Sequence, residues 1–426
     1  MLRRHICLFL CLSLILIFSC RDVSDHSAPV IAIFQPQSGY SLEVPDTLYV
    51  KGEIDDDRVI RSVTVSLVNK DKIPVAPARY FFPEASYFKI NTSLVISDKT
   101  LKSGIYSLVV TASDGYQVRQ SAVPLNLVET PNTLLGYLAV TAPLSFKSLI
   151  TKLDSDFEKD ASFVFPKNFR LSGMSSLWEQ FFFVSETPGV IHTFSTDNWE
   201  IVREYAAAPP RPEFTGLWVD RQLVFSTLNG DAGILNSHGN LVIRTPPASD
   251  KIIQCLAADE VYIYAEHVSL NGAETWLTVF YRITGAPRTQ LLIKQDIVAL
   301  IPFGGKVLIL SNTSEKAIIS EYDPGTLKMT ELKVMENVKI ISALKIDDHL
   351  FIILTPEKVL LFNRYQNHVT DYLFTAYQFG KYDSLNNHLY MVNGNVLDVI
   401  QFVTSNLLYQ KVFEDKLVDF HIVYNK

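Results

Sequence analysis

Apolar and polar positions recur at a regular spacing along most of the chain. In six segments a polar or glycine turn is followed at once by a short apolar run. The runs begin at Phe181, Leu223, Val261, Val307, Leu350 and Leu389. Successive starts lie 42, 38, 46, 43 and 39 residues apart, and one further step of 43 back from Phe181 reaches Leu138. Because β-propeller blades repeat every ~40–50 residues, the spacing predicts a seven-bladed β-propeller over residues 133–426.

One repeat shows the four strands of a blade. Apolar runs at 340–344, 350–354, 359–362 and 369–374 are separated by turn-forming residues. The first repeat lacks its first strand, whereas residues 417–423 form a strand with no hairpin after it. We expect this last strand to pair with the first repeat and close the ring, which removes an open sheet edge. The repeats carry no Trp-Asp signature of WD40 proteins, and they resemble divergent seven-bladed propellers of bacterial envelope proteins.

Residues 30–128 alternate between apolar and polar positions in the manner of β-strands. Period-two runs include Val63, Val65 and Leu67, and turn clusters lie at 37–39, 55–57 and 113–115. About 100 residues of short alternating strands is the size of an immunoglobulin-like β-sandwich. The run 104–115 resembles the penultimate strand and following turn of bacterial Ig-like modules, which implies a spacer or adhesive role. The predicted fold class is therefore all-β, an N-terminal Ig-like sandwich followed by the propeller.

The first 20 residues have the pattern of an export signal. Arg3 and Arg4 precede an apolar run from Ile6 to Phe18, which is too short for a comfortable membrane span. The end of this run, Ile17-Phe18-Ser19-Cys20, resembles the lipobox of bacterial lipoproteins, although Phe18 is bulkier than the usual spacer. The resemblance implies cleavage after residue 19 and lipid attachment at Cys20, with residues 20–29 as a tether. An ordinary signal peptide or a membrane anchor is the alternative.

Charge and cysteine content narrow the class of partner. The formal net charge is −7, and the basic residues form no cluster longer than a pair, which argues against a nucleic-acid partner. The cysteines are Cys7, Cys11, Cys20 and Cys255. The first two belong to the predicted leader and the third to the lipid site, so we expect no intrachain disulfide and interpret Cys255 as a small apolar core residue.

Candidate chemistry is sparse. We find no nucleophile elbow, zinc motif or phosphate loop, and we assign no catalytic residue, cofactor or metal ligand. The segment Asp154–Asp160 resembles a calcium loop but has Lys159 where the turn glycine belongs, so it is interpreted as a solvated hairpin tip. Residues 55–57 are either a calcium-binding turn or a solvated one. His349 and His388 recur at the same place in successive repeats, which indicates a position beside a turn.

Two functions remain open. In the first, the protein is a non-catalytic lipoprotein whose propeller is a scaffold for an envelope protein, or an accessory subunit of an outer-membrane complex. The predicted location is the outer membrane of a Gram-negative bacterium, at its periplasmic face or the cell surface. In the second, the propeller binds or degrades glycans, with tryptophans that stack on sugars. The four candidates are Trp178, Trp199, Trp218 and Trp276, although packing between blades is the preferred interpretation of Trp178 and Trp218.

Overall fold

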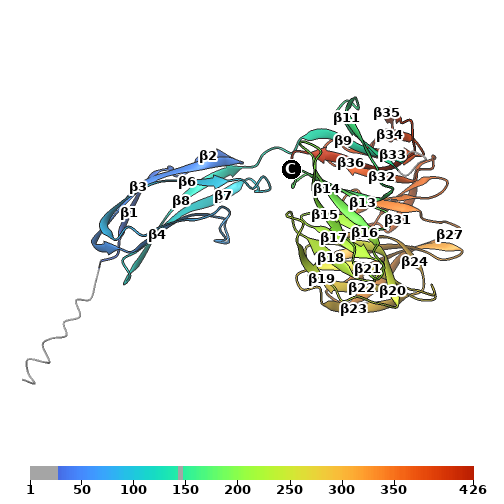
Figure 1. Cartoon of the computed structure of the whole chain (residues 1–426), viewed down its shortest axis with the longest axis horizontal. Helices are drawn as coiled ribbons and strands as arrows, with labels where there is room; N and C mark the ends of the chain where they lie inside the picture. Colours follow the sequence, from blue (N-terminus) through green and yellow to red (C-terminus); the bar gives the residue numbers. More distant parts are fainter. Residues whose placement is uncertain (1–26, 143–146) are drawn as a thin grey trace, which may run out of the picture. The chain divides into compact units, whose positions relative to one another are not determined.

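The chain folds into two compact β-rich units, Met1–Pro131 and Asn132–Lys426. The computed structural model describes residues 27–142 and 147–426, and these ranges contain strands and turns but no helix (Figure 1). The fold class is therefore all-β, as predicted. Cys20, the predicted leader 1–19 and most of the predicted tether lie outside the described residues. Within the described ranges there is no helix with the length and apolarity that a membrane crossing requires.

Unit 1 is a sandwich of two sheets around one core. Its eight strands are β1 (Val30–Gln35), β2 (Tyr40–Glu43), β3 (Asp46–Ile60), β4 (Ser62–Val68), β5 (Arg79–Phe81), β6 (Ala85–Ile96), β7 (Gly104–Ser113) and β8 (Val118–Val128). The sheet orders are β1-β3-β6 and β2-β8-β7-β4-β5. Alternate residues of both sheets, among them Val50, Val65 and Val110, are fully buried between them. The period-two pattern thus produces one solvated and one buried face on each sheet.

The prediction of a turn at residues 55–57 is wrong. Strand β3 runs through these three aspartates to Ile60. Its pairing with β6 shifts from Asp55 opposite Tyr87 to Ile60 opposite Ala85, so the extra residues form a bulge. A bulge exposes consecutive polar residues without ending the strand, and this is why the sequence resembles a turn.

Unit 2 contains seven four-stranded antiparallel sheets, which we number as blades 1 to 7 (Figure 1). The strands of blades 1 to 3 are β36 (Leu417–Tyr424), β9 (Leu134–Thr141), β10 (Ser148–Leu153), β11 (Lys159–Phe165); β12 (Phe169–Ser175), β13 (Gln180–Ser185), β14 (Val190–Ser195), β15 (Ile201–Ala206); and β16 (Phe214–Val219), β17 (Leu223–Thr227), β18 (Ala232–Leu235), β19 (Leu241–Arg244). Those of blades 4 and 5 are β20 (Lys251–Ala258), β21 (Tyr262–Ser269), β22 (Thr275–Tyr281), β23 (Pro287–Ile293); and β24 (Asp296–Phe303), β25 (Lys306–Asn312), β26 (Lys316–Asp323), β27 (Lys328–Glu336). Those of blades 6 and 7 are β28 (Ser342–Lys345), β29 (Leu350–Leu354), β30 (Val359–Asn363), β31 (His368–Leu373); and β32 (Phe379–Asp383), β33 (His388–Asn393), β34 (Val396–Gln401), β35 (Leu407–Val412). The first strands of neighbouring blades lie side by side around the ring, so the seven sheets form a β-propeller.

The C-terminal strand closes the ring, as predicted. Strand β36 pairs with β9 from Leu417 opposite Thr141 to Tyr424 opposite Leu134, and it is the innermost strand of blade 1. Phe420 of β36 is fully buried. Its ring lies 5.4 Å from that of Tyr137 and 5.5 Å from that of Tyr390 in blade 7. Closure therefore joins the first and last blades through a shared aromatic core.

Repeated turn chemistry explains the repeated sequence pattern. In four blades an aspartate lies at the end of the first strand or within two residues after it and accepts the backbone N–H two residues on, at 2.7–2.9 Å. These residues are Asp220, Asp259, Asp347 and Asp383. Every turn from the third to the fourth strand contains one residue with positive φ. These residues are Phe157, Trp199, Gly239, Gly285, Leu327, Asn367 and Ser405.

Charged side chains connect neighbouring blades. Arg282 of blade 4 donates to both carboxylate oxygens of Asp220 in blade 3, at 2.7 and 2.8 Å. Arg364 of blade 6 donates to Glu321 of blade 5 at 2.6 and 2.7 Å. Arg282 is almost completely buried, and a bidentate pair is geometrically specific. These contacts connect blade 3 with blade 4 and blade 5 with blade 6.

Candidate functional site

The turns of unit 2 lie at two opposite ends of the ring. Antiparallel strands reverse at every turn, so the turns joining first to second and third to fourth strands all lie at one end, the hairpin face. The second-to-third turns and the connections between blades lie at the other end, the connection face. By sequence, the hairpin-face turns contain eleven carboxylates and three arginines, a net charge of −8. The connection-face turns contain nine carboxylates and seven basic residues, a net charge of −2.

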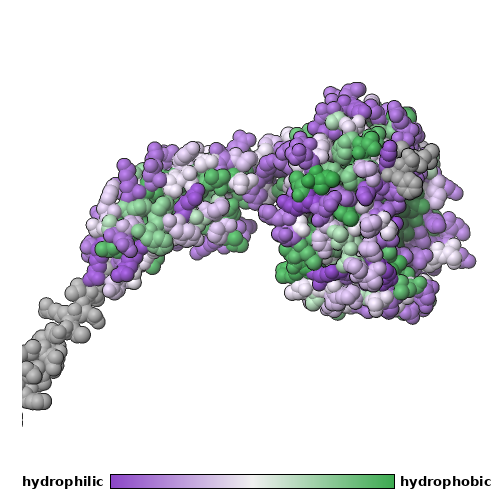
Figure 2. Space-filling model, viewed as in Figure 1, coloured by the Kyte–Doolittle hydropathy of each residue, from purple (hydrophilic) through white to green (hydrophobic). Residues whose placement is uncertain are grey.

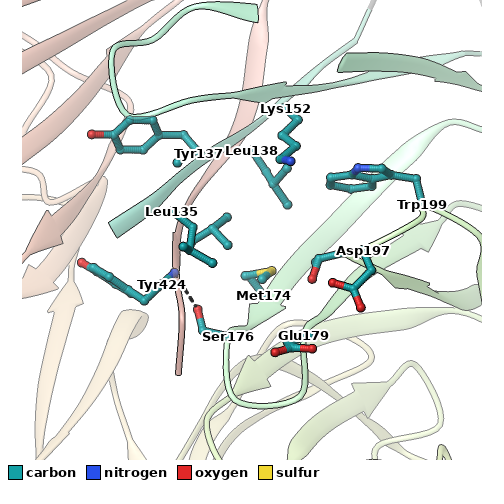
Figure 3. Close-up of a pocket in the computed structure, with 13 residues that line it drawn as sticks. Leu135, Tyr137, Leu138, Lys152, Met174, Ser176, Glu179, Asp197, Trp199 and Tyr424 are labelled. Atoms are coloured by element: carbon teal, nitrogen blue, oxygen red, sulfur yellow. Dashed lines mark hydrogen bonds between the residues drawn. The ribbon is translucent and has the colours of Figure 1, made fainter. Parts of the chain in front are cut away.

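A pocket of about 330 Å³ opens between blades 1 and 2 at the hairpin face. Its residues come from β9, β10, β12, the end of β36 and two turns of blade 2. Figure 3 shows Trp199, Asp197 and Glu179 along one side, Leu135 across from them and Met174 between. The pocket thus combines an apolar floor with carboxylates at its rim.

The backbone holds this pocket in shape. A Cβ atom at Gly136, whose φ is +143°, would lie 2.2 Å from the carbonyl oxygen of Leu153, so only glycine lets β9 pass this close to the end of β10. The Ser176 hydroxyl accepts the Tyr424 N–H at 3.1 Å, which fixes the end of β36 to a turn of blade 2. Trp199 is half-buried against Phe163, with ring centroids 5.3 Å apart.

Charged side chains of both signs line the pocket. The Lys152 ammonium, which Figure 3 shows among the pocket residues, lies 2.6 Å from the Asp160 carboxylate. That pair is neutral, and Glu179 and Asp197 also line the pocket. Three more carboxylates lie in the turn 154–158 of blade 1, and Glu200 follows in blade 2. Carboxylates and apolar side chains therefore lie side by side at this end of blades 1 and 2.

A larger groove of about 750 Å³ lies between blades 3 and 4 at the same face. It is lined by apolar residues such as Val242 and Ile283, which are exposed. Its charged residues already have partners, because Arg282 binds Asp220 and Arg221 lies 3.4 Å from Glu260. These charged residues of the groove are therefore engaged in contacts between blades 3 and 4. The view in Figure 2 shows that such apolar residues are interspersed with hydrophilic ones on the surface of unit 2.

A serine, a histidine and an aspartate meet on the innermost strands, but not in the geometry of a hydrolase. The Ser172 hydroxyl donates to Asp419 at 2.7 Å and lies 2.8 Å from Nε2 of His421. The same Nε2 lies 3.3 Å from Asp419. In a catalytic triad the serine and the aspartate contact different ring nitrogens. Here one nitrogen faces both groups and the serine proton is bound by the carboxylate, so the cluster is a structural contact between β12 and β36.

The surroundings keep Asp419 charged. Burial by itself raises the pKa of this carboxyl, but the positive charges of His421 and Lys381 and the hydrogen bond from Ser172 outweigh it and hold the pKa well below its usual range. Lys381 belongs to β32 of blade 7, and its Nζ lies 3.7 Å from Asp419. The network therefore connects blades 7, 1 and 2 at the point where the ring closes.

The other residues singled out by sequence take structural positions. Trp178 packs in the core between blades 2 and 3, and Trp218 contributes to the cores on both sides of blade 4. Trp276 lies under the Lys251 ammonium, 3.8 Å from its ring centroid. His349 ends a hairpin-face turn and His388 begins β33, the expected position beside a turn. Within the described ranges, no three His, Cys, Asp or Glu residues are grouped so that they could hold a metal ion.

The segment Asp154–Asp160 forms the turn between β10 and β11 and the start of β11. Oδ1 of Asp154 accepts the N–H groups of Asp156 and Glu158, both at 2.9 Å. An aspartate that caps its own turn in this way explains the resemblance to a calcium loop. Of the four tryptophans named from the sequence as candidates for stacking on sugars, Trp199 lines the neighbouring pocket. Its signal was its place among the acidic residues 197–200, in a turn equivalent to 154–158.

Burial raises the pKa of two groups in blade 4, one half-buried and one buried. Cys255 lies on the innermost strand β20, and burial, together with the charge of Glu266, raises the pKa of its thiol to about 12. Glu266 of β21 is 2% exposed and accepts the Ile297 N–H at 2.9 Å through Oε1, while among the described residues its Oε2 has no hydrogen-bond partner. Burial first, and then the charge of Asp296, raise the pKa of Glu266 from 4.5 to about 7.

Replacing this carboxylate, Glu266→Gln, is expected to stabilise unit 2 increasingly as pH rises from about 4.5 to about 7 and above. In the wild type, the unfolded chain loses the Glu266 proton near pH 4.5 and the folded one near pH 7, so the free energy of unfolding falls as pH rises through this window. A pKa raised from 4.5 to about 7 corresponds to roughly 3 kcal/mol. The glutamine keeps the contact with Ile297 and does not titrate. Guanidinium unfolding of both proteins at pH 5 and pH 8 measures the effect.

Between pH 5 and pH 8, the difference in free energy of unfolding between variant and wild type should grow by most of these roughly 3 kcal/mol. The histidines His192 and His267 act in the opposite direction, because burial lowers their pKa and stability is lost as pH falls. They are present in both proteins, so their contribution cancels in the difference. If the free energies of unfolding of variant and wild type differed by the same amount at pH 5 and pH 8, the assignment of Glu266 as a buried carboxyl with a raised pKa would be contradicted.

Comparisons with known proteins add little to what the strand pairing shows about the fold. No protein-family model and no curated protein matches the chain. A quinonprotein alcohol dehydrogenase-like protein from Bacteroides thetaiotaomicron is 9% identical with a TM-score of 0.48, over 93% of this chain and 99% of that one. BamB from Moraxella catarrhalis is 10% identical with a TM-score of 0.43, over 67% and 92%. The Neurospora crassa Pan2 WD40 domain is 11% identical with a TM-score of 0.48, over 65% and 85%. The propeller assignment therefore rests on the seven sheets and their closure.

Proposed function

We propose that this chain is a non-catalytic lipoprotein of the bacterial cell envelope whose propeller is a scaffold for a protein partner, or an accessory subunit of an outer-membrane complex. The observation that carries the proposal is the unequal charge of the two ends of a rigid ring, −8 at the hairpin face against −2 at the connection face. Rigid, charged surfaces steer association and reject partners of like charge.

The lipid anchor and the spacer complete this proposal. Cys20 receives the lipid after cleavage of residues 1–19, and residues 20–29 connect the lipid to unit 1. Unit 1 is an Ig-like spacer, which its two sheets around a single core support. The protein is anchored to the outer membrane of a Gram-negative bacterium, at the periplasmic face or at the cell surface.

Glycan binding or degradation is the second candidate function. It is favoured by one observation, the presence of Trp199 beside Glu179 and Asp197 in a single pocket. Two features weigh against it. The Trp199 ring already packs against Phe163. The pocket volume of about 330 Å³ lies at the lower limit of the ~300–1,000 Å³ that is typical of ligand sites. The pocket therefore suits a single long side chain better than an oligosaccharide.

Affinity purification of the intact chain from detergent-solubilised envelopes tests the scaffold proposal. We expect a stoichiometric membrane-protein partner that dissociates as salt is raised, because screening weakens charge-driven contacts. The matched control is the same chain purified at about 0.5 M sodium chloride throughout. Recovery of the protein alone at low salt, together with binding on a glycan array, would replace the scaffold proposal with the glycan one.

A further inference from the structure

We propose that the outer face of the five-stranded sheet of unit 1 is a contact surface for a second copy of this chain. The sheet has the strand order β2-β8-β7-β4-β5, and its inner face packs on the core of the sandwich (Figure 1). The proposal goes beyond the scaffold function of the propeller and does not depend on it. It rests on the charge of this face, the chemistry of its polar groups and its area.

The outer face of this sheet carries almost no charge. Fully buried residues such as Val110 mark the positions that point into the core, so the alternate positions point outward. Among the outward positions of these five strands, all of which the structure describes, Glu43 at the end of β2 is the one charged residue. The outer face of the other sheet differs, because Lys51, Glu53 and Lys89 lie on it.

A face without charge allows two copies of the same charge to meet. The formal net charge of the chain is −7, so two copies repel one another most strongly where carboxylates face carboxylates. The cores of protein interfaces are depleted in charged residues, because a buried charge without a partner loses its hydration. Contact with a second copy is therefore least costly at the outer face of this sheet.

Hydroxyl groups make this face complementary to itself. Cross-strand pairs on the face include Ser62 opposite Ser113 and Thr64 opposite Thr111. A hydroxyl group both donates and accepts hydrogen bonds, so it can pair with the same group of a second copy, whereas an ionised carboxylate or an ammonium cannot. In a dimer with twofold symmetry each surface meets its own equivalent. Hydroxyl groups are thus the polar groups that suit a contact of this kind.

Small side chains occupy the middle of the face. Val109 lies near the centre of the middle strand β7, opposite Ser66 of β4 and Ala122 of β8. None of these three residues is buried. Because they are small, a second sheet can approach to the ~10 Å at which sheets pack face to face.

The dimensions of the sheet favour contact through its face over contact through its edges. The edge strands β2 and β5 contain four and three residues, and short edges offer few backbone groups for pairing with another chain. At ~3.3 Å per residue and ~4.8 Å between strands, the five strands cover roughly 550 Å². Two copies together would bury roughly 1,100 Å², just above the ~1,000 Å² expected of a specific interface. We therefore expect a weak, reversible dimer.

Sedimentation velocity over a range of protein concentrations tests the proposal. The protein begins at residue 21, so that both the sandwich and the propeller are complete. We expect monomers at about 1 μM and dimers at about 100 μM, as for a small interface. Because no charges of opposite sign meet in this contact, the dimer should persist from about 0.05 M to about 0.5 M sodium chloride.

A lysine in the middle of the face should disrupt the dimer. In Val109→Lys each copy brings a positive charge to the contact, and self-association should weaken by about tenfold or more. The matched control is Val95→Lys, the same exchange at an outward position of β6 in the other sheet, which is 50% exposed and should stay within about twofold of the wild type. Thr111→Lys, with Thr47→Lys of the other sheet as its control, repeats the test two residues along β7. Circular dichroism melting confirms that each variant is folded.

Mixing two variants tests whether the face meets its own equivalent. Val109→Lys and Val109→Glu should each be monomeric alone, because like charges then meet across the contact. An equimolar mixture brings opposite charges together and should associate at least about fivefold more strongly than either variant alone. Monomeric wild type at every concentration, equal association of Val109→Lys and Val95→Lys, or a mixture no stronger than its components would overturn the proposal.

Propeller variants distinguish failure of this proposal from failure of the proposed function. Asp197→Lys in a hairpin-face turn and Glu274→Lys in a connection-face turn should leave self-association within about twofold of the wild type. Loss of self-association with Asp197→Lys but not with Val109→Lys would place the contact on the propeller and overturn the proposal. A wild type that stays monomeric but binds an insoluble glycan, with binding lost in Val109→Lys, would also overturn it, because the face then has another occupant. Neither result bears on whether a partner co-purifies with the propeller.

Discussion

Deletion of residues 417–426 is expected to prevent folding of the whole propeller, although it removes only one strand. Strand β36 contributes the fully buried Leu417 and Phe420 and all hydrogen bonds on the inner edge of β9. Truncating a buried leucine or phenylalanine to alanine costs roughly 2–5 kcal/mol each. Loss of both, with the ladder and the aromatic contacts to blade 7, reaches the ~5–15 kcal/mol that holds a typical protein folded. Thermal unfolding followed by circular dichroism measures the result.

A shorter deletion provides the control for this experiment. Removing only residues 425 and 426 leaves β36 intact, so a cooperative transition near the wild-type temperature should remain. Unit 1 has its own core and should keep its own transition in both truncated proteins. A protein without residues 417–426 that still melted cooperatively like the wild type would contradict the role of β36 as the closing strand.

Replacement of Cys20 by serine is expected to move the protein from the membrane to the soluble fraction. In the proposed lipoprotein this thiol carries the lipid, and each buried CH₂ group of an acyl chain contributes ~0.8 kcal/mol to membrane binding. Serine forms no thioether, so Cys20→Ser removes the anchor and leaves only the polar tether. Fractionation of cells, with immunoblotting of the membrane and soluble fractions, measures the change.

The matched control is the same exchange at the other cysteine of the mature chain. Cys255 lies in blade 4 and has no part in the anchor, so Cys255→Ser should remain with the membrane. If Cys20→Ser stayed in the membrane fraction after washing at high salt, the lipid at this position would be excluded, and an uncleaved apolar anchor would explain the location instead.

The propeller could be predicted because each blade repeats the same local chemistry. Aspartates such as Asp220 and Asp259 directly follow first strands and cap the turn that comes next, so polar pairs precede apolar runs at a recurring spacing. The closing strand followed from a simple imbalance, a first repeat with too few strands and a last strand with no partner. Both signals can be read from this one sequence, so neither requires a comparison with other proteins.

Single residues were harder to place than strands. An apolar run after a turn was predicted to begin at Val261, but this residue lies in the turn and is 51% exposed, and β21 begins at Tyr262. The aspartates 55–57 lie in a bulge of β3 instead of a turn. In both cases the misplaced residues lie at a turn or a bulge, where the regular alternation of the strand is interrupted. A one-residue error in the register there exchanges the buried and the exposed face of a strand.

The pocket could not be predicted because its parts are distant in sequence. Leu135, Met174, Asp197 and Tyr424 come together only when the ring closes and blades 1 and 2 pack against one another. The acidic hairpin face, in contrast, was accessible from sequence once turns were assigned, since alternate turns must lie at the same end of the ring. The formal net charge of −7 does not reveal this face, because a total says nothing about how charge is divided between the hairpin face and the nearly balanced connection face.

Site-specific photo-crosslinking in intact cells tests the central claim, that the hairpin face of the anchored propeller binds a protein partner. Benzoylphenylalanine is placed at position 197 in one strain and at position 274 in another, with Cys20 retained in both. The account predicts a discrete crosslinked adduct from position 197 and none from position 274. An adduct from position 274 alone, or none from either position, would contradict it.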